Sequence, residues 1–402
     1  MTTTNPPVPV TAPHTAARAW TAVVMLAVAL FAFVSTELMP IGLLPQIAHG
    51  TGVSVGTAGF LVTGFAFIVG VLASPMTALT SRMDRRLLVV VLLAACAAGN
   101  LIAGLAPNYV VLLAGRALIA LAIGVFWSIG AATAVRIVSS EHGVRATSLV
   151  LSGLSLASVL GVPLGTALGE HTSWRFTFAA LGALSTVALL IGLLVIPSVP
   201  ASKPTTTGRQ QPVWKLPALR VAVAVTGLAM IGNFLAFTYI TPFLTDVTGV
   251  PGGSVGLVLV IWGAAGLVGN FAIAPLLNRS LRRTLLITVA LLAAALVGLS
   301  AFGASFPLVA VALVLWGAAY AALPVVLQTW VFRVSVASGQ ADAATSMYVS
   351  AYNLAIGLGA LVGGLVIAGP GAGAVVLIGG IVTATALLVL LPTSRHQPDT
   401  DH

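Results

Sequence analysis

Charged residues are scarce in this chain of 402 residues. Asp, Glu, Lys and Arg together make up 6% of it, whereas 59% of the residues are hydrophobic. A soluble globular domain usually carries about 25% charged residues. The mean hydropathy is correspondingly high, at +1.11. The shortage of charge excludes an ordinary soluble domain and indicates a protein with many membrane-spanning segments.

Cysteine is nearly absent as well. The single Cys96 lies in an apolar run, which excludes an intrachain disulfide and a cysteine-based metal site. Its simplest role is that of a small buried hydrophobic residue. The apolar runs contain no histidine, no HExxH motif and no paired acids, so we expect neither a metal, a cofactor nor an enzyme.

Long apolar runs are what the sequence has in abundance. A helix that crosses a bilayer needs about 20 predominantly apolar residues. Twelve runs satisfy this, and the predicted spans are about 20–46, 55–80, 87–106, 108–135, 145–168, 174–196, 217–244, 255–278, 284–304, 307–332, 342–368 and 371–392. The first run, of about 25 residues, is too long for the apolar part of a cleavable signal peptide.

The basic residues predict the orientation. If the spans alternate in direction, fifteen of the seventeen Lys and Arg lie on one side, Arg175 lies on the other, and Arg116 lies within a span. The positive-inside rule then places both termini in the cytoplasm. The net charge of +9 therefore reflects orientation and anionic lipid, not a nucleic-acid partner.

The chain also divides into two similar halves. A shift of 200 residues aligns Gly56 with Gly256 and Pro75 with Pro275, which is typical of transporters built from two parallel repeats of six helices. A Pro-, Thr- and basic-rich stretch separates the halves. The predicted units are a disordered cytoplasmic N-terminus (1–17), an N-terminal bundle (18–196), a cytoplasmic linker (197–216), a C-terminal bundle (217–392) and a cytoplasmic tail (393–402).

Glu37 and Arg116 are the only ionisable residues well inside the predicted spans. A charge at such depth costs at least about 2.5–3.5 kcal/mol, so it needs a partner or a water-filled cavity. Counting along the two helices places both residues roughly 12–14 Å below the same membrane surface. One hypothesis is a static ion pair between spans one and four. The other, which we favour, is a protonation switch, because burial favours the neutral acid and a nearby Arg favours the carboxylate.

Aromatic and amide side chains at helical spacing predict the rest of a central cavity. In the second half, aromatic residues occupy the positions that correspond to Glu37 and Arg116. A site that is polar on one side and aromatic on the other suits a small, mostly uncharged organic molecule. Packing between helices is the alternative role for each of them. The candidate substrate-binding residues are Phe33, Trp127, Asn233, Phe237, Tyr239, Trp316, Tyr320, Tyr352 and Asn353.

Two further segments suggest conformational roles. The loop after span two reads "TSRMDRRLL", with Asp84 among arginines that include Arg85, and a solvated charge run is its simplest interpretation. Span five contains "GLSLASVLGVPLGTALG". Its small residues allow another helix to pack closely, and Pro163 weakens the helical hydrogen bonding there. Such a helix can bend or slide.

Several of these motifs together resemble the major facilitator superfamily over about residues 20–392. More closely, they resemble its twelve-helix drug:proton antiporter branch, near the bacterial sugar-efflux, arabinose-efflux and chloramphenicol-exporter proteins. The matching stretches are "TELMPIGLLPQIA", "GRALIALAIGVFWSI", "GVPLGTALG" followed by "SWRFTF", and "YITPFLTDVTG".

The resemblance implies roles by position. Glu37 and Arg116 match the proton-coupling acid of helix one and the arginine of helix four, and Asp84 and Arg85 match a loop motif that latches one conformation. The antiporter motif of helix five is matched by Gly161, Pro163 and Gly165. Two positions depart from the family pattern: Thr80 stands where the loop motif usually has Gly, and Leu281 stands where the second-half copy of the motif would have an acid.

The sequence therefore predicts an all-α membrane protein with twelve helices in two pseudo-symmetric six-helix bundles. We expect a monomeric, proton-coupled exporter of small organic molecules, such as drugs, sugars or related metabolites, in a bacterial inner membrane. Its energy source is the proton gradient, and its partners are the solute, protons and lipid. An uptake symporter or uniporter is the nearest alternative. A membrane-embedded enzyme and a non-transporting receptor are alternatives from other classes.

Overall fold

Helices make up nearly the whole of the computed structural model, which describes residues 16–200, 215–336 and 341–391. Within these ranges there is no strand, and twelve helices are long and apolar enough to cross a membrane. This confirms the predicted fold class. Hydropathy predicted it well because a span in lipid must satisfy all of its backbone hydrogen bonds internally, which requires a long apolar helix.

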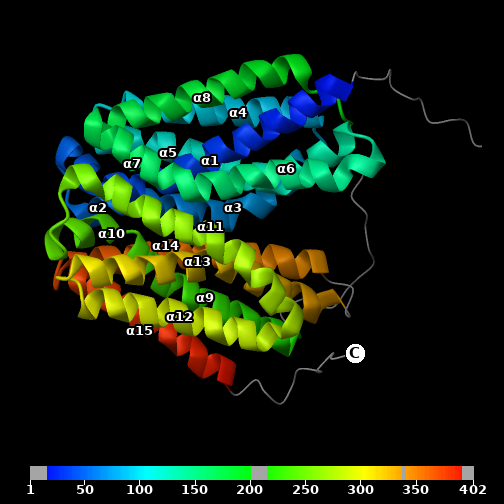
Figure 1. Cartoon of the computed structure of the whole chain (residues 1–402). Coiled ribbons are helices and arrows are strands. Elements are labelled where there is room, and N and C mark those ends of the chain that lie inside the picture. The colour runs from blue at the N-terminus through cyan, green and yellow to red at the C-terminus, as the bar shows by residue number, and fades with distance from the viewer. Residues whose placement is uncertain (1–15, 201–214, 337–340, 392–402) are drawn as a thin grey trace, which may run out of the picture.

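Within each half the helices follow one another in chain order, as Figure 1 shows. In the first half they are α1 (Ala16–Thr51), α2 (Val55–Ala58), α3 (Phe60–Thr80), α4 (Arg85–Gly104), α5 (Tyr109–Ile137), α6 (Gly143–Leu156), α7 (Val162–His171) and α8 (Trp174–Val195). In the second half they are α9 (Pro217–Phe237), α10 (Ile240–Pro242), α11 (Val255–Arg279), α12 (Leu281–Ala301), α13 (Phe306–Val336), α14 (Ala341–Ile367) and α15 (Ala372–Leu390).

The first helix corrects one predicted boundary. Ala16 and Ala17, assigned above to a disordered segment, are the first residues of α1. Alanine has the highest helix propensity, and the Arg18 guanidinium donates to the Leu194 and Val195 carbonyls at the end of α8. Residues 1–15, most of the predicted linker (201–214) and the tail beyond 391 lie outside the described residues.

Two helices depart from regular α-geometry where the sequence predicted uninterrupted spans. Span five is α-helical to Leu156, π-helical from Ala157 to Gly161, and α-helical again from Val162. Span seven ends at Phe237 and continues as the short α10 and a π-helical turn, Phe243–Val247. Pro163 explains the first change, because it lacks the N–H that an α-helix would direct to the carbonyl four residues earlier.

The hydrophobic cores follow the two halves. One core draws its buried residues from between Ala22 and Ile196, and another draws most of its residues from between Leu219 and Leu390. In Figure 1 the blue-to-green helices α1 to α8 form the upper part and helices α9 to α15 form the lower part. Each half therefore buries its own apolar side chains, as expected for two bundles that can move relative to each other.

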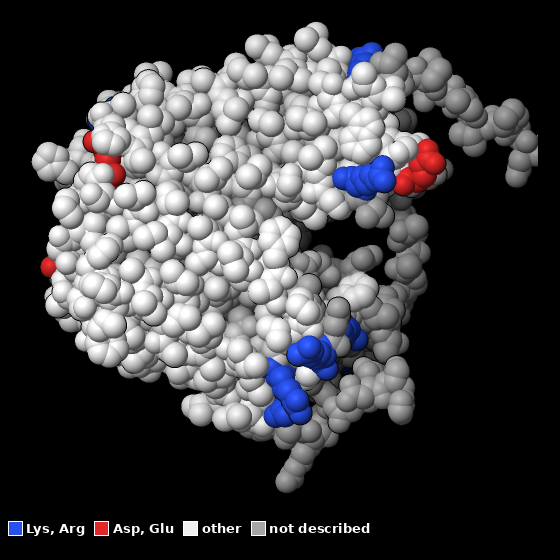
Figure 2. Space-filling model, viewed as in Figure 1, with Lys and Arg blue, Asp and Glu red and all other residues white. Residues whose placement is uncertain are grey.

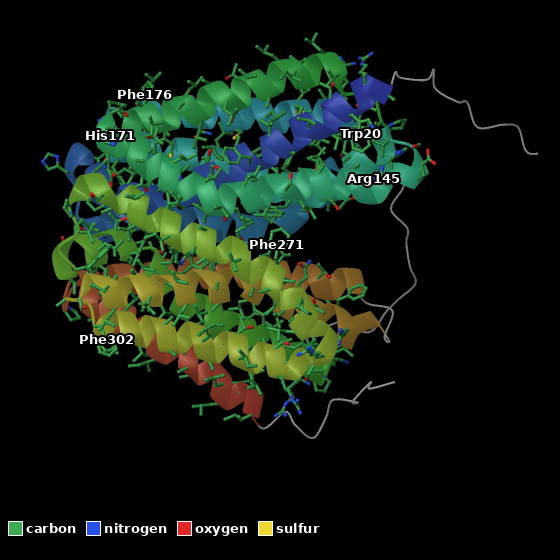
Figure 3. The ribbon with its side chains drawn as sticks, in the orientation of Figure 1. Trp20, Arg145, His171, Phe176, Phe271 and Phe302 are labelled. Carbon is green, nitrogen blue, oxygen red and sulfur yellow. The ribbon has the colours of Figure 1, made fainter. Side chains whose placement is uncertain are left out.

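One end of the molecule carries an excess of arginines, and we call it the basic end: Arg18, Arg86, Arg136, Arg282 and Arg283 lie there, at the starts of α1, α4 and α12 and the end of α5. We call the other end the far end. In Figure 3, Trp20 and Arg145 lie toward the basic end, and His171 and Phe302 lie toward the far end.

The two halves meet closely toward the far end. There the backbones of Gly56 and Gly364 approach so closely that a Cβ atom on Gly56 would lie 2.7 Å from the Gly364 carbonyl oxygen. On the other flank, a Cβ atom on Gly256 would lie 2.9 Å from the Ala167 nitrogen. Figure 2 shows the surface hollowed between the halves at the basic end. The structure is thus closed at the far end and open at the basic end.

Candidate functional site

A narrow cavity lies between the two halves, near the middle of the spans. The volume that the centre of a water molecule can occupy in it is about 10 Å³, close to the minimum that holds one water. Both halves contribute to its wall, which consists of Glu37, Leu38, Val62, Phe65, Ala66, Arg116, Phe234 and Ile356. The two ionisable residues singled out by the sequence therefore line one cavity.

Arg116 is 1% exposed and is held by backbone carbonyls. Its NH1 atom donates to the Thr36 carbonyl oxygen, and its NH2 atom donates to those of Glu37 and Leu61, each at 3.1 Å. The centre of the guanidinium also lies 4.2 Å from the centroid of the Phe65 ring, a cation–π distance. Arg116 thus joins α5 to α1 and α3 through main-chain atoms.

The Glu37 side chain is partly exposed and faces the cavity. The described residues contain no salt bridge between its carboxyl and Arg116, although the two groups interact electrostatically. Two hydroxyls of the opposite half, on Tyr320 and Tyr352, lie within electrostatic range of the same carboxyl. The geometry therefore does not support a direct static ion pair, and it leaves the Glu37 carboxyl free to bind a proton or a solute.

The second half places four of the predicted binding residues together. The Phe237 ring stacks on Trp262 at 4.5 Å and on Tyr320 at 5.8 Å. Trp316 lies edge-on to Phe237, and its Nε1 donates to Asn233 Oδ1 at 2.8 Å. Phe234 lines the cavity, and its ring contacts the rings of Phe237 and Tyr320. The cavity is thus continuous with a wall of aromatic side chains.

Three other predicted binding residues lie apart from the cavity wall. Phe33 is fully buried and packs against Phe126 at a ring distance of 4.9 Å, within the core of the first half. The side chain of Trp127 is 39% exposed. Tyr239 fills the space left by Gly59 at the junction of the halves, and its hydroxyl donates to the Ala360 carbonyl at 3.0 Å. Their roles in binding remain predictions.

The remaining two binding candidates lie on α14. The Tyr352 ring packs against Tyr348 at a ring-centroid distance of 5.9 Å. The neighbouring amide of Asn353 donates to the Val349 carbonyl of its own helix at 3.0 Å. Within the described residues, the side-chain hydrogen bond of Asn353 is thus local, and the ring contact of Tyr352 is with Tyr348 of its own helix.

The loop after α3 forms a helix cap. The Asp84 carboxylate accepts from the backbone N–H groups of Arg86 and Leu87, the first turn of α4, and from the Ser198 hydroxyl at 2.7 Å. A carboxylate at that position satisfies donors that the helix itself cannot. The Arg85 backbone N–H donates to the Val199 carbonyl. The loop therefore ties α4 to the segment that follows α8 at the basic end.

The helix-five motif packs directly against α1. A Cβ atom on Gly161 would lie 2.8 Å from the Ser35 hydroxyl oxygen, and one on Gly165 would lie 2.9 Å from Met39 Cγ. Pro163 lies between them, buried in the first turn of α7. Ser35 and Met39 flank Glu37 in the sequence, so this helix supports the segment of α1 that carries the acid.

Apart from Glu37 and Arg116, the residues of the cavity wall were missed by the sequence predictions, and so was Trp262 of the aromatic wall. Phe65 covers the Arg116 guanidinium, and Trp262 stacks on a neighbouring ring. The repeat offset of 200 residues could have found Trp262, since it aligns Trp262 with Val62, and Val62 lines the cavity. An isolated Phe in an apolar helix gives no comparable signal.

Comparisons with known proteins agree with the fold. The family model described as "Major Facilitator Superfamily" matches residues 24–224 and again 222–402. Among solved structures, the nucleoside transporter NupG is similar with a TM-score of 0.78 and 12% identity, covering 93% of this chain and 99% of NupG.

Two further structures are similar over most of their length. The human organic anion transporter MFSD10 has a TM-score of 0.67 and 18% identity, and the match covers 94% of this chain and 100% of MFSD10. A bacterial homolog of the human lysosomal transporter Spinster, in an inward-facing and occupied conformation, has a TM-score of 0.72 and 15% identity, covering 94% and 96% of the two chains. At these identities the similarities establish the fold alone.

Proposed function

The chain belongs to the major facilitator superfamily and is therefore a secondary transporter, and within that class we propose that it is a proton-coupled exporter of small, mostly uncharged organic molecules. Drugs, sugars and related metabolites are the proposed solutes. We further propose that it acts as a monomer in a bacterial inner membrane, with the basic end in the cytoplasm.

The observation that carries this proposal is the Glu37 carboxyl. It is the acid that lines the cavity between the halves, and Arg116, the nearby cation, uses three of its hydrogen bonds on backbone carbonyls. A carboxyl in this position can exchange its proton with whichever side the cavity faces. Its charge then differs between the two open states, which is what coupling to a proton gradient requires.

The transport cycle follows from the two halves. With the basic end open, the deprotonated Glu37 and the aromatic wall of the second half bind the solute. Rearrangement of the halves closes the basic end and opens the far end. Protonation of Glu37 from that side weakens polar contacts with the solute and favours its release. Arg116 keeps α1, α3 and α5 in register throughout, because its guanidinium bridges their main chains.

Four alternatives lead to different observations. An uptake symporter would accumulate solute in cells along the proton gradient, and a uniporter would ignore that gradient. The resemblance of the helix-five segment to the antiporter motif favours export over both. A membrane-embedded enzyme would convert its solute chemically, and a receptor would bind solute without moving it.

The test is an efflux screen in cells that overproduce the protein. Solutes should include drugs, sugars and nucleosides, together with organic anions, since the similar structures include nucleoside and organic anion transporters. We expect reduced accumulation of at least one solute, reversed when the proton gradient is collapsed. Glu141→Gln is a suitable control, because Glu141 is an exposed acid that pairs with His142. Uptake in place of efflux would contradict the proposal.

A further inference from the structure

Five aromatic side chains form one cluster in the second half, and we call it the aromatic cluster: Phe234 and Phe237 from α9, Trp262 from α11, and Trp316 and Tyr320 from α13. The Phe237 ring contacts the other four. Trp262 lies at ring-centroid distances of 4.5 Å from Phe237, 5.3 Å from Tyr320 and 6.1 Å from Trp316. None of the five carries a charge. Phe234 connects the cluster to the central cavity, because it also lines that cavity.

Asn233 is oriented by this cluster. An indole N–H can only donate a hydrogen bond, so the amide atom that faces Trp316 Nε1 at 2.8 Å must be the oxygen, Oδ1. The Nδ2 atom of Asn233 is consequently fixed as a donor on the other side of the amide. Asn233 is 0% exposed, and its Nδ2 has no hydrogen-bond partner among the described residues.

Trp262 supplies the second N–H donor that has no partner among the described residues. Its side chain is 3% exposed, and its Nε1 makes no hydrogen bond within the described part of the chain. Buried polar groups in proteins are nearly always hydrogen-bonded, and an exception calls for an explanation. Here two exceptions occur, one in the aromatic cluster and one in the Asn233 side chain that is hydrogen-bonded to it, and both are N–H donors.

This combination specifies a ligand chemistry. Two free N–H groups require an acceptor, and in the absence of a charge the matching group is a neutral carbonyl, ether or hydroxyl oxygen. The aromatic faces favour a flat, apolar ring beside it. Asn233 and the aromatic cluster include no carboxylate or cation, so their own contacts favour a neutral group.

We propose that Asn233 and Trp262 form a hydrogen-bond-donor subsite that binds an oxygen of a neutral, ring-bearing substrate whose ring packs in the aromatic cluster. The subsite rests on the proposed function in one respect, since it assumes that the central cavity admits solutes. It extends that function by naming the substrate class and the end of the substrate that faces the second half.

The test measures binding to purified protein without any proton gradient. The probes are benzamide, benzyl alcohol and phenyl β-D-glucoside, which share a ring and an oxygen acceptor, and ethylbenzene, which lacks the acceptor. Indole N–H signals from ¹⁵N-tryptophan-labelled protein are assigned with Trp262→Phe and Trp316→Phe. We expect an oxygen-bearing probe to shift the Trp262 signal downfield, and ethylbenzene to leave it in place.

Affinity provides the second readout. Trp262→Phe keeps the ring and removes the donor, so it should weaken binding of an oxygen-bearing probe roughly tenfold and leave ethylbenzene unaffected. Trp330→Phe is the matched control, because Trp330 Nε1 is also buried without a partner among the described residues, yet it lies outside the cluster. It should bind the probes as the native protein does.

Two results overturn the subsite. One is that no oxygen-bearing probe binds more tightly than ethylbenzene. The other is that Trp262→Phe and Trp330→Phe bind such a probe equally well. A failure of proton-driven efflux would contradict the proposed function and leave these binding results unaffected, so the two failures can be told apart.

Discussion

Arg116 and Glu37 show how two residues of opposite charge can share a cavity without forming a salt bridge. Main-chain oxygens, in place of a carboxylate, accept hydrogen bonds from both terminal nitrogens of the buried guanidinium, and its Nε has no partner among the described residues. This arrangement also leaves the acid without a fixed cation. Sequence reasoning could place both residues at equal depth because helical rise is constant. It could not decide their contacts, since these depend on rotamers and on the backbone of α3.

At the residue scale, we expect Glu37→Gln to remove proton coupling while the protein still folds. The amide has nearly the same shape as the protonated acid and cannot release a proton near neutral pH. A gradient of one pH unit supports roughly tenfold accumulation for each proton exchanged, because 1.4 kcal/mol corresponds to a factor of ten. In proteoliposomes the variant should equilibrate its solute and reach an accumulation ratio of about one under the same gradient.

The interpretation of that experiment needs two comparisons. Detergent-purified Glu37→Gln should match the native protein in yield and melting temperature, and Glu141→Gln should accumulate solute normally. A folded Glu37→Gln protein that still concentrates solute against a pH gradient would contradict the role of Glu37. The proton site would then have to be one of the acids at the helix ends, such as Glu170.

At the scale of helices, the sequence predicted the number and type of elements and missed their irregularities. Hydropathy integrates over about 20 residues, so twelve spans were evident. The π-helical segment at Ala157–Gly161 and the break after Phe237 depend on a few hydrogen bonds. Pro163 gave a local signal for the first, and Pro242, which lacks the N–H that would reach the Thr238 carbonyl, gave one for the second.

The helix-five motif leads to a prediction at this scale. Gly161→Leu or Gly165→Leu should reduce transport at least tenfold, because the new side chain must displace Ser35 or Met39 next to Glu37. Overpacking of this kind typically costs about 1–3 kcal/mol, so we expect the variants to reach the membrane with a lowered melting temperature. Initial rates of efflux and thermal unfolding of the purified proteins measure the two effects.

A control for helix five is available in α12. A Cβ atom on Gly298 would meet nothing within 4 Å, so Gly298→Leu changes the same residue type in a helix without the close contact. It should transport at nearly the native rate. Efflux by Gly161→Leu and Gly165→Leu that equals efflux by Gly298→Leu would show that close packing of helix five on α1 is not needed.

At the scale of the whole molecule, orientation in the membrane is the next expectation to test. Under the positive-inside rule the basic end faces the cytoplasm. In a Cys96→Ala background, a cysteine at Asn108 should react with an impermeant thiol reagent added outside intact cells. A cysteine at Ser202 should react only after the cells are opened. Labelling of position 202 in intact cells would reverse the orientation.

The division into two halves was evident from the sequence, but which end of the molecule is closed was not. A repeat offset of 200 residues aligned Gly56 with Gly256, and both residues prove to lie where one half contacts the other. The sequence could identify them as equivalent positions because a helix begins at the same point of both repeats. Which end is closed depends on a balance between two packings of the same residues, and no single position in the sequence encodes that balance.

If solute passes by alternation of the two halves, a covalent bond across the closed far end must stop transport. Ala167→Cys with Gly256→Cys provides one, since a Cβ atom at position 256 would lie 3.1 Å from that of residue 167. This is slightly below the usual disulfide spacing of about 3.5–4.5 Å, and a small adjustment of the helix ends supplies the difference. In a Cys96→Ala background, oxidation should abolish efflux and reduction should restore it.

For that conclusion to hold, a disulfide formed within one half must not affect efflux. Leu296→Cys with Gly380→Cys joins α12 to α15, where a Cβ atom on Gly380 would lie 3.2 Å from that of Leu296, and both helices belong to the second half. Oxidation of this pair should leave efflux unchanged, because the half moves as a unit. Continued efflux by the oxidised 167–256 pair, with its cross-link verified by mass, would mean that solute passes while the far end stays closed, and alternation of the halves would have to be abandoned.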